Sequence, residues 1–130
     1  MDLRDRPEDE DFRREVRAWL AEHVVGEYAE LGGRGGSGDE TFGFEVRLRW
    51  ERVLAADGWT GIGWPSEYGG RGASIAHQVI FNEEYVRAKA PGRVSILGEG
   101  LLGPTIIQYG TPEQRERFLP PILAGTEPPP

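Results

Sequence analysis

The side chains that could do chemistry in this 130-residue chain are few and widely spaced. It contains two histidines, His23 and His77, and no cysteine. Because neither histidine has a partner at metal-ligand or catalytic-triad spacing, we expect a structural or surface role for each. The lack of cysteine excludes a disulfide framework, a thiolate metal site and a thiol nucleophile. The sequence therefore predicts no metal site and no catalytic constellation.

Two adjacent carboxylates, Glu83 and Glu84, lie in the most apolar predicted helix. A buried carboxylate with a raised pKa could serve as a general base. Arg87 follows Glu83 by four residues and Glu84 by three, which is the spacing of ion pairs on a helix. We favour ion pairing with Arg87 over a role as a base.

The loop Gly58–Gly72, GWTGIGWPSEYGGRG, combines Trp59, Trp64 and Tyr68 with glycines. Large apolar side chains in a loop must be buried to be useful, so this segment is either functional or a plug that seals a helical domain. Its end, Gly69–Gly72, precedes a helix expected near Ser74 and so superficially suggests a phosphate cradle. No strand precedes it, and the known phosphate-binding fingerprints are absent.

Charge and hydropathy restrict the classes of partner. The 15 basic and 22 acidic residues give a net charge of −7, which argues against nucleic acid. No apolar run approaches the length of a membrane span. The acidic N-terminus, MDLRDRPEDEDF, does not fit a targeting peptide. We expect one domain in a soluble, cytoplasmic protein that binds neither nucleic acid nor membrane.

Apolar residues at helical spacing predict the elements that must position these groups. A first helix begins near Pro7 and buries Phe12, Val16, Trp19, Leu20, His23 and Val24. The glycine-rich segment Gly26–Gly43 is expected to be a mobile loop. A second helix runs from Thr41 or Phe42 to Asp57. Its predicted buried stripe is Val46, Trp50, Val53 and Leu54, and its predicted exposed face is Arg47, Arg49, Glu51 and Arg52.

The second half of the chain predicts three more helices. Ser74 caps one that extends to about Ala90, and its apolar residues surround it so completely that we expect a central helix. The last begins at Pro112 after the cap Thr111, and we expect Pro120-Pro121 to limit it to about Leu119. With no alternating strand pattern, the sequence predicts an all-α antiparallel bundle of about five helices.

The helix between these two, from about Arg93 to Tyr109, is unusual. Gly98, Gly100 and Gly103 interrupt it, and Pro104 should bend it. Each helical glycine costs about 1 kcal/mol relative to alanine. We expect compensation by close approach of another backbone or of a ligand.

Two stretches resemble a known family. Two segments resemble the N-terminal helical domain of acyl-CoA dehydrogenases: GWPSEYGGRG (63–72) and GPTIIQYGTPEQRERFLPPILAGTE (103–127). Their residues are similar to those of the bacterial members that degrade fatty acids and sterol side chains. The resemblance implies an oligomeric flavoprotein in which a glutamate base and FAD remove the α-proton and β-hydride of an acyl-CoA thioester. It also implies a middle β-domain and a C-terminal helical domain, which usually carry the flavin contacts and the base.

The resemblance predicts how this chain fits into such an enzyme. Residues 1–127 would form the N-terminal domain. The three prolines at 128–130 would be a truncated end, so that both further domains are absent. We therefore expect no catalytic or cofactor-binding residue and no bound FAD on this chain, and no dehydrogenase activity from it alone. The aromatic loop becomes a family signature whose Trp59, Trp64 and Tyr68 pack as a joint, with Gly69–Gly72 near the rim of the site.

Within the family, the glycine-bearing helix forms a wall of the acyl-chain pocket. Matching it by position assigns Val94, Leu97, Gly98 and Leu101 to substrate binding, and the alternative is that they are core residues. Two other functions stay open. One is a non-catalytic helical module that docks on a separate flavin-binding subunit. The other is a free-standing acyl-CoA-binding bundle, which we disfavour because the sequence has no cluster of basic residues that could bind the CoA phosphates.

Overall fold

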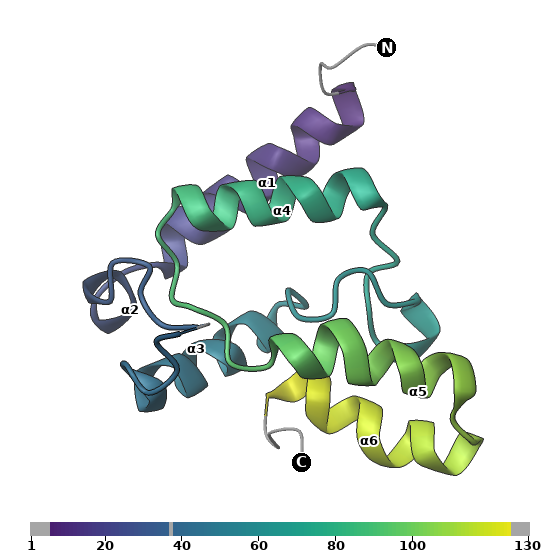
Figure 1. Ribbon diagram of the computed structural model, residues 1–130. Coiled ribbons are helices and arrows are strands. Elements are labelled where there is room, and N and C mark those ends of the chain that lie inside the picture. Colours follow the sequence, from purple (N-terminus) through teal and green to yellow (C-terminus); the bar gives the residue numbers. More distant parts are fainter. Residues whose placement is uncertain (1–5, 37, 126–130) are drawn as a thin grey trace.

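The computed structural model describes residues 6–36 and 38–125, and within them all the regular secondary-structure elements are helices, apart from one isolated β-bridge between Gly36 and Asp39. The elements are α1 (Pro7–His23), α2 (Glu27–Glu30), α3 (Phe44–Ala56), the 3-10 turn η1 (Ser66–Tyr68), α4 (Ile75–Arg87), the π-helix η2 (Gly98–Leu102), α5 (Gly103–Tyr109) and α6 (Pro112–Ala124). Figure 1 shows α1 beside α4 in one layer, and α5 beside α6 in another. The all-α class expected from the sequence is confirmed.

Helices α1 and α4 run in the same direction. Near their starts, Asp9 Oδ1 lies 2.9 Å from His77 Nε2, and farther along both helices Arg17 binds Glu84. The aromatic loop brings the chain back so that α4 begins beside the start of α1 (Figure 1). The expected antiparallel arrangement therefore holds for the hairpin of α5 and α6 but not for this pair.

Both histidines have the structural roles that we expected. The His77 ring stacks on Phe12, with 4.1 Å between ring centres, in addition to its contact with Asp9. The His23 ring stacks on Trp19 at the same separation, and His23 Nδ1 lies 2.8 Å from the Trp19 carbonyl.

The aromatic loop joins two separate hydrophobic cores. Trp59, 2% exposed, packs in the larger core, which contains Val16, Leu20, Trp50, Leu54, Ile62, Phe81 and Ala90. Trp64, 4% exposed, packs with Leu119 and Ile122 in the second core, where Tyr68 is half-buried. The backbone N–H of Ala73 then donates to the Ile62 carbonyl just before α4 begins. The loop is thus the packed joint that the sequence predicted.

Two predictions about helix α4 have different outcomes. Ser74 caps it as expected, because its hydroxyl accepts a hydrogen bond from His77 N–H at 3.1 Å. The prediction of a central helix is wrong for this chain. Only one side of α4 packs on α1, and Ile75, Val79 and Val86 on other faces are between 51% and 75% exposed.

Helix α6 begins as predicted but ends later. Thr111 and Gln114 form the expected capping box at 3.1 and 2.9 Å. The helix continues through Pro120 and Pro121 to Ala124, so the predicted end at Leu119 is wrong. The fixed φ of proline suits a helix, and burial of Leu119 and Ile122 in the second core outweighs the lost backbone hydrogen bonds. Gly125, with φ of 67°, ends it.

The segment expected to be a mobile loop is partly structured. It contains α2, and the guanidinium of Arg47 fastens its end by donating to the carbonyls of Glu40 at 2.7 Å and Phe42 at 3.3 Å. Arg47 also donates to the Gly92 carbonyl at 2.9 Å. It is 2% exposed, so its assignment to an exposed helix face is wrong.

Candidate functional site

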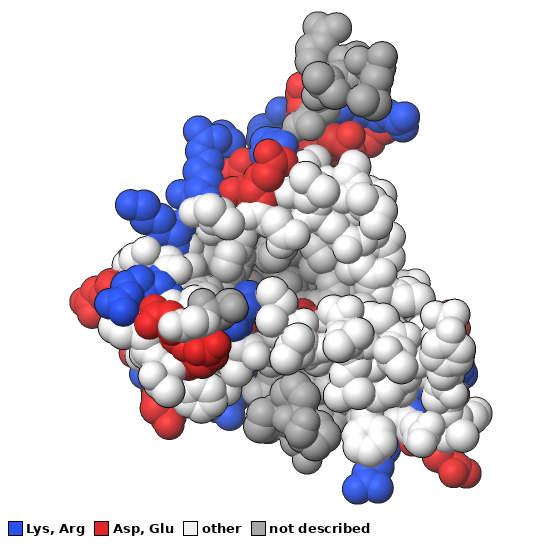
Figure 2. Space-filling model, in the orientation of Figure 1, with Lys and Arg blue, Asp and Glu red and all other residues white. Residues whose placement is uncertain are grey.

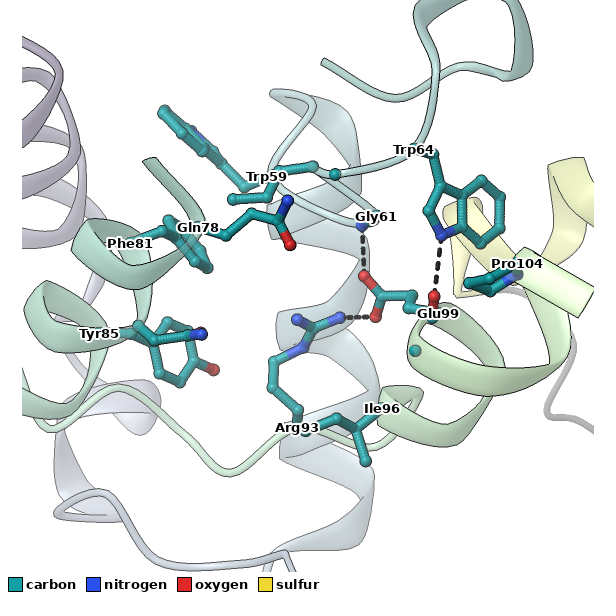
Figure 3. Close-up of a pocket in the computed structure, with 14 residues that line it drawn as sticks. Trp59, Gly61, Trp64, Gln78, Phe81, Tyr85, Arg93, Ile96, Glu99 and Pro104 are labelled. Atoms are coloured by element: carbon teal, nitrogen blue, oxygen red, sulfur yellow. Dashed lines mark hydrogen bonds and ion pairs between the residues drawn. The ribbon is translucent and has the colours of Figure 1, made fainter. Parts of the chain in front are cut away.

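A cavity of about 360 Å³ lies between α4, the aromatic loop and the helix that begins at Ile96 (Figure 3). This volume is in the range of small-molecule sites. Its apolar walls include Trp59, Ile62, Phe81 and Ile96, and its polar lining includes Gln78, Asn82, Arg93 and Glu99. The loop contributes through its first half, from Trp59 to Trp64. Gly69–Gly72, expected near the rim, are not among the lining residues.

The helix on one side of this cavity is continuous from Ile96 to Tyr109 but changes its hydrogen-bond register. It begins at Ile96 rather than near Arg93. Gly103 N–H donates to the Gly98 carbonyl, five residues back, as in a π-helix. Pro104 has no N–H to offer the Glu99 carbonyl, and the Trp64 indole N–H donates to that carbonyl instead, at 2.8 Å. Where the sequence predicts a bend at Pro104, the structure thus has a change of register, the π-helical turn Gly98–Leu102, called the π-turn below.

The glycines of this helix have distinct roles. A Cβ atom on Gly103 would lie 2.1 Å from Trp64 Cζ2, so only glycine lets this ring pack against the backbone. A close approach occurs here, but the approaching group is a side chain rather than the backbone or ligand that we expected. A Cβ on Gly100 would meet nothing within 4 Å, because Gly100 faces the open cavity.

A buried ionic cluster forms the base of the cavity. Arg93 donates from Nε and Nη2 to the two carboxylate oxygens of Glu51, each at 2.9 Å, and also binds Glu99. Glu99 accepts the backbone N–H of Gly61, and Glu51 accepts that of Val94 at 2.7 Å. The cluster ties α3, the aromatic loop and the start of the π-turn together. Figure 3 shows the part of it in which Glu99 meets Arg93 and Gly61.

Glu51 is fully buried, so its predicted place on an exposed face is also wrong. The sequence did hold a signal for both buried charges of α3. Arg47, Trp50, Glu51 and Leu54 follow the spacing i, i+3, i+4 and i+7, which puts all four on one face.

The charges of the cluster depend on one another. Burial raises the pKa of Glu99, and Arg93 opposes this shift only in part. Burial also disfavours the charge of Arg93, but the attraction of Glu51, with that of Glu99, outweighs it and raises the pKa of Arg93. Both carboxylates are occupied by donors, so this arrangement positions backbone rather than presenting a general base.

The residues predicted to bind substrate lie beside the cavity rather than in its lining. Leu97 and Leu101 are 67% and 64% exposed, and they form a ridge next to the one made by Ile96 and Gly100. Val94 is half-buried and Gly98 is buried at the start of η2.

Glu83 and Glu84 form ion pairs, as expected, but not with Arg87. Glu84 binds Arg17 at 2.8 Å and Arg13 at 2.8 Å, both on α1, and Glu83 lies 3.4 Å from Arg13. The predicted partner was wrong because helix packing supplies closer arginines than the same helix does.

Among residues 6–36 and 38–125, no group of three or more potential ligands is placed to hold a metal.

The Gly69–Gly72 segment does not fit the diphosphate of a flavin nucleotide. The Arg71 guanidinium lies 3.6 Å from the Trp59 ring centre and donates to the carbonyls of Gly58 and Asp57 at 2.7 and 2.8 Å. The one arginine of this segment is thus committed to packing.

Within the described part of the chain, no helix is long and apolar enough to cross a membrane.

Comparisons with known proteins agree with this fold. Residues 6–126 match the family model described as "Acyl-CoA dehydrogenase, N-terminal domain". The chain is 58% identical over 118 residues to acyl-CoA dehydrogenase IpdE1 of Mycolicibacterium smegmatis, and the match covers 91% of this chain and 30% of that protein. The chain therefore spans about a third of the length of such curated relatives.

Solved structures give the same result. The ChsE4-ChsE5 complex from Mycobacterium tuberculosis superposes with a TM-score of 0.78 at 36% identity, over 97% of this chain and 30% of that chain. A structure described as the Tcur3481-Tcur3483 steroid ACAD superposes with a TM-score of 0.79 at 36% identity, over 97% of this chain and 31% of that chain.

Proposed function

Because this chain belongs to the family of acyl-CoA dehydrogenase N-terminal domains, we propose that it supplies one wall of the acyl-chain pocket of an FAD-dependent enzyme. The complete enzyme would oxidise the α,β bond of an acyl-CoA thioester in lipid or sterol side-chain degradation. The observation that carries the proposal is the cavity beside the π-turn. Its apolar side chains can cover an acyl chain, and Gly100 leaves room for one next to the helix.

In this proposal, FAD and the catalytic base belong to other parts of the enzyme, and the domain by itself is inactive. Two features of the described residues support this division. Glu51 and Glu99 are both occupied by Arg93 and by backbone N–H groups, and Arg71 is committed to the Trp59 ring. The contribution of this chain is then to bind and orient the acyl group and to keep water from it.

An exposed apolar surface supports a partner for this domain. Figure 2 shows few charges over α4 and α5, whereas charges gather around α1. The exposed apolar residues of this surface are Ile75, Val79, Val86, Ile96, Leu97, Leu101 and Tyr109. A surface of this kind marks an interaction site. We propose that the remaining domains of an oligomeric enzyme cover it, since curated relatives are about three times as long as the matched segment.

The second candidate is a non-catalytic helical module that docks on a separate flavin-binding subunit. The same exposed surface would serve it, and two of the similar structures are described by pairs of protein names. The intact mass and flavin content of the native gene product distinguish the two. A long flavoprotein chain supports the first candidate, and a short chain that copurifies with a flavoprotein supports the second.

The acyl-wall proposal is tested by narrowing the cavity in the complete enzyme. We expect Ile96→Trp to lower kcat/KM for the longest accepted acyl-CoA by about tenfold or more relative to a short one, because one lost methylene contact already changes kcat/KM by about tenfold. Glu113→Trp, on the exposed first turn of α6, is the matched control. If Ile96→Trp and Glu113→Trp give the same chain-length profile, the cavity does not hold the acyl chain.

The neighbouring ridge is tested by Leu101→Trp. We propose that Val94, Leu97, Gly98 and Leu101 belong to the acyl-binding wall of the complete enzyme, in which the exposed Leu97 and Leu101 would face the acyl group. Leu101→Trp should then also change the range of accepted acyl chains. If the range of accepted acyl chains is unchanged, this ridge does not belong to the acyl-binding wall, and the ridge of Ile96 and Gly100 alone would form it.

A further inference from the structure

Glu99 differs from the other residues of the cavity because both its side chain and its backbone carbonyl contact the aromatic loop. We propose that Glu99 is a positioning residue that determines which acyl-chain lengths the cavity accepts. It holds the π-turn in its register and so keeps Gly100, rather than Leu101, on the cavity wall. The inference rests on the proposed function and names a residue that determines specificity at the same site.

Three contacts fix Glu99 in place. Its side chain is 10% exposed, and its carboxylate accepts the backbone N–H of Gly61 with one oxygen and binds Arg93 with the other. Its carbonyl accepts the indole N–H of Trp64 at 2.8 Å. Figure 3 shows these three partners around the residue. A rotation of the helix at Glu99 would break all three contacts.

Pro104 leaves a carbonyl without its backbone donor, and the register of the helix decides which one. In an α-helical register, the Gly103 N–H would donate to the Glu99 carbonyl. The carbonyl of Gly100 would then lack a donor, because Pro104 has no N–H. In the observed register, Gly103 donates to Gly98, and the Glu99 carbonyl lacks the backbone donor. The indole N–H takes this place, so the contacts of Glu99 favour the π register.

The register decides which side chains face the cavity. A π-turn contains one residue more than an α-turn, and each residue turns a helix by about 100°. Helix α5 is held in the second core, where Ile106 packs. Loss of the extra residue would therefore move Leu97 to the place of Ile96. It would also move Leu101 toward the place of Gly100, where a leucine side chain would fill part of the cavity.

The experiment uses the complete enzyme. It measures the ratio of kcat/KM for the longest straight-chain acyl-CoA that the wild type oxidises to kcat/KM for a short one. We expect Glu99→Ala to lower this ratio by about tenfold, because one hydrogen bond to a charged group changes the balance between two registers by about that factor or more. If Glu99 only lined the cavity, the smaller alanine would leave more room, and the ratio would rise or stay the same.

Further variants separate positioning from general damage. Glu99→Gln keeps an acceptor for the Gly61 N–H, so it should lower the ratio by only about threefold. Adding Leu101→Ala to Glu99→Ala removes the side chain that would enter the cavity, and it should restore the ratio. Glu84→Ala is the matched control, since it removes another buried carboxylate that arginines bind, between α1 and α4. It should leave the ratio unchanged.

The outcomes distinguish this inference from the proposed function. A ratio that does not fall in Glu99→Ala, or a fall that Leu101→Ala does not reverse, overturns the role of Glu99 while the dehydrogenase function stands. An equal fall in Glu84→Ala overturns it as well. If Glu99→Ala does not fold, Glu99→Gln with and without Leu101→Ala gives the same test. If the flavin-loaded wild type oxidises no acyl-CoA, the proposed function itself fails.

Discussion

At the scale of single residues, Glu84 shows how packing decides the charge state of a carboxylate. Its side chain is 2% exposed on α4, and two arginines of α1 bind it. Hydrogen bonding from Arg17 lowers the pKa of Glu84 to about 2; burial opposes this shift, and Arg13 adds to it. Because the folded state lowers this pKa below its usual 4.5, the carboxylate stabilises the fold above about pH 4.5, and this contribution is lost as pH falls through about 2.

The first prediction follows from this linkage. Glu84→Gln should lower the free energy of unfolding by about 2–3 kcal/mol at neutral pH, because the buried carboxylate is replaced by a neutral amide that cannot keep the ion pairs with Arg13 and Arg17. The deficit relative to wild type should shrink below about pH 4.5 and vanish near pH 2, which urea denaturation over this range measures.

Glu83→Gln is the matched control, because Glu83 is 58% exposed and its contact with Arg13, at 3.4 Å, is longer than the 2.8 Å contacts of Glu84. We expect it to cost less than about 1 kcal/mol at any pH. Equal losses for the two variants, or a Glu84→Gln deficit that persists at the lowest pH, would contradict the linkage.

Residue patterns predicted the kind of interaction better than its partner. Ion pairing of Glu83 and Glu84 was correct, but the partners come from α1, which no spacing within α4 could reveal. The buried charges of α3 were missed because charged side chains are mostly exposed. Arg47 and Glu51 share the face of Trp50 and Leu54, so their spacing did mark them as candidates for a buried network.

At the scale of elements, the π-turn depends on contacts between a helix and the aromatic loop. Pro104 removes one backbone donor, and Trp64 replaces it at the Glu99 carbonyl. Gly103 admits the ring that carries this donor. The loop and the helix are therefore mutually adapted, and neither adopts this geometry on local preference alone.

The second prediction compares two glycines of this helix. Gly103→Ala should destabilise the chain by about 2 kcal/mol, because its Cβ would lie 2.1 Å from Trp64 Cζ2 and the ring cannot move without leaving the second core. Gly100→Ala should be neutral or stabilise by up to about 1 kcal/mol, since its Cβ meets nothing within 4 Å. Thermal or urea unfolding of both variants measures the difference. A stabilised Gly103→Ala variant would show that the packing of Trp64 is not tight.

Element boundaries were predicted well where a cap determines them and poorly where tertiary contacts do. Ser74 and Thr111 start their helices as expected. The end of α6 was wrong because Ile122 lies beyond the two prolines and is buried in the second core. The parallel pair of α1 and α4 follows from how the aromatic loop folds back, which periodicity within a helix does not encode.

At the scale of the whole molecule, we propose that the chain is one part of a larger assembly. Two cores support a cavity that opens toward an apolar surface, and the match spans about a third of the curated relatives' length. Sequence resemblance identified the family, and the family match and the superposed structures confirm it. The residues on the exposed surface could not be assigned from the sequence, because their apolar character is the same in a core and in an interface.

The most direct test of the account is anaerobic mixing of an acyl-CoA with the complete flavin-loaded protein and, in parallel, with this chain alone. The account predicts that the complete protein loses its oxidised-flavin absorption and forms the enoyl-CoA, while this chain binds no FAD and leaves the thioester intact. Flavin binding and acyl-CoA oxidation by this chain alone, or a complete protein whose flavin stays oxidised with every acyl-CoA tested, would contradict it.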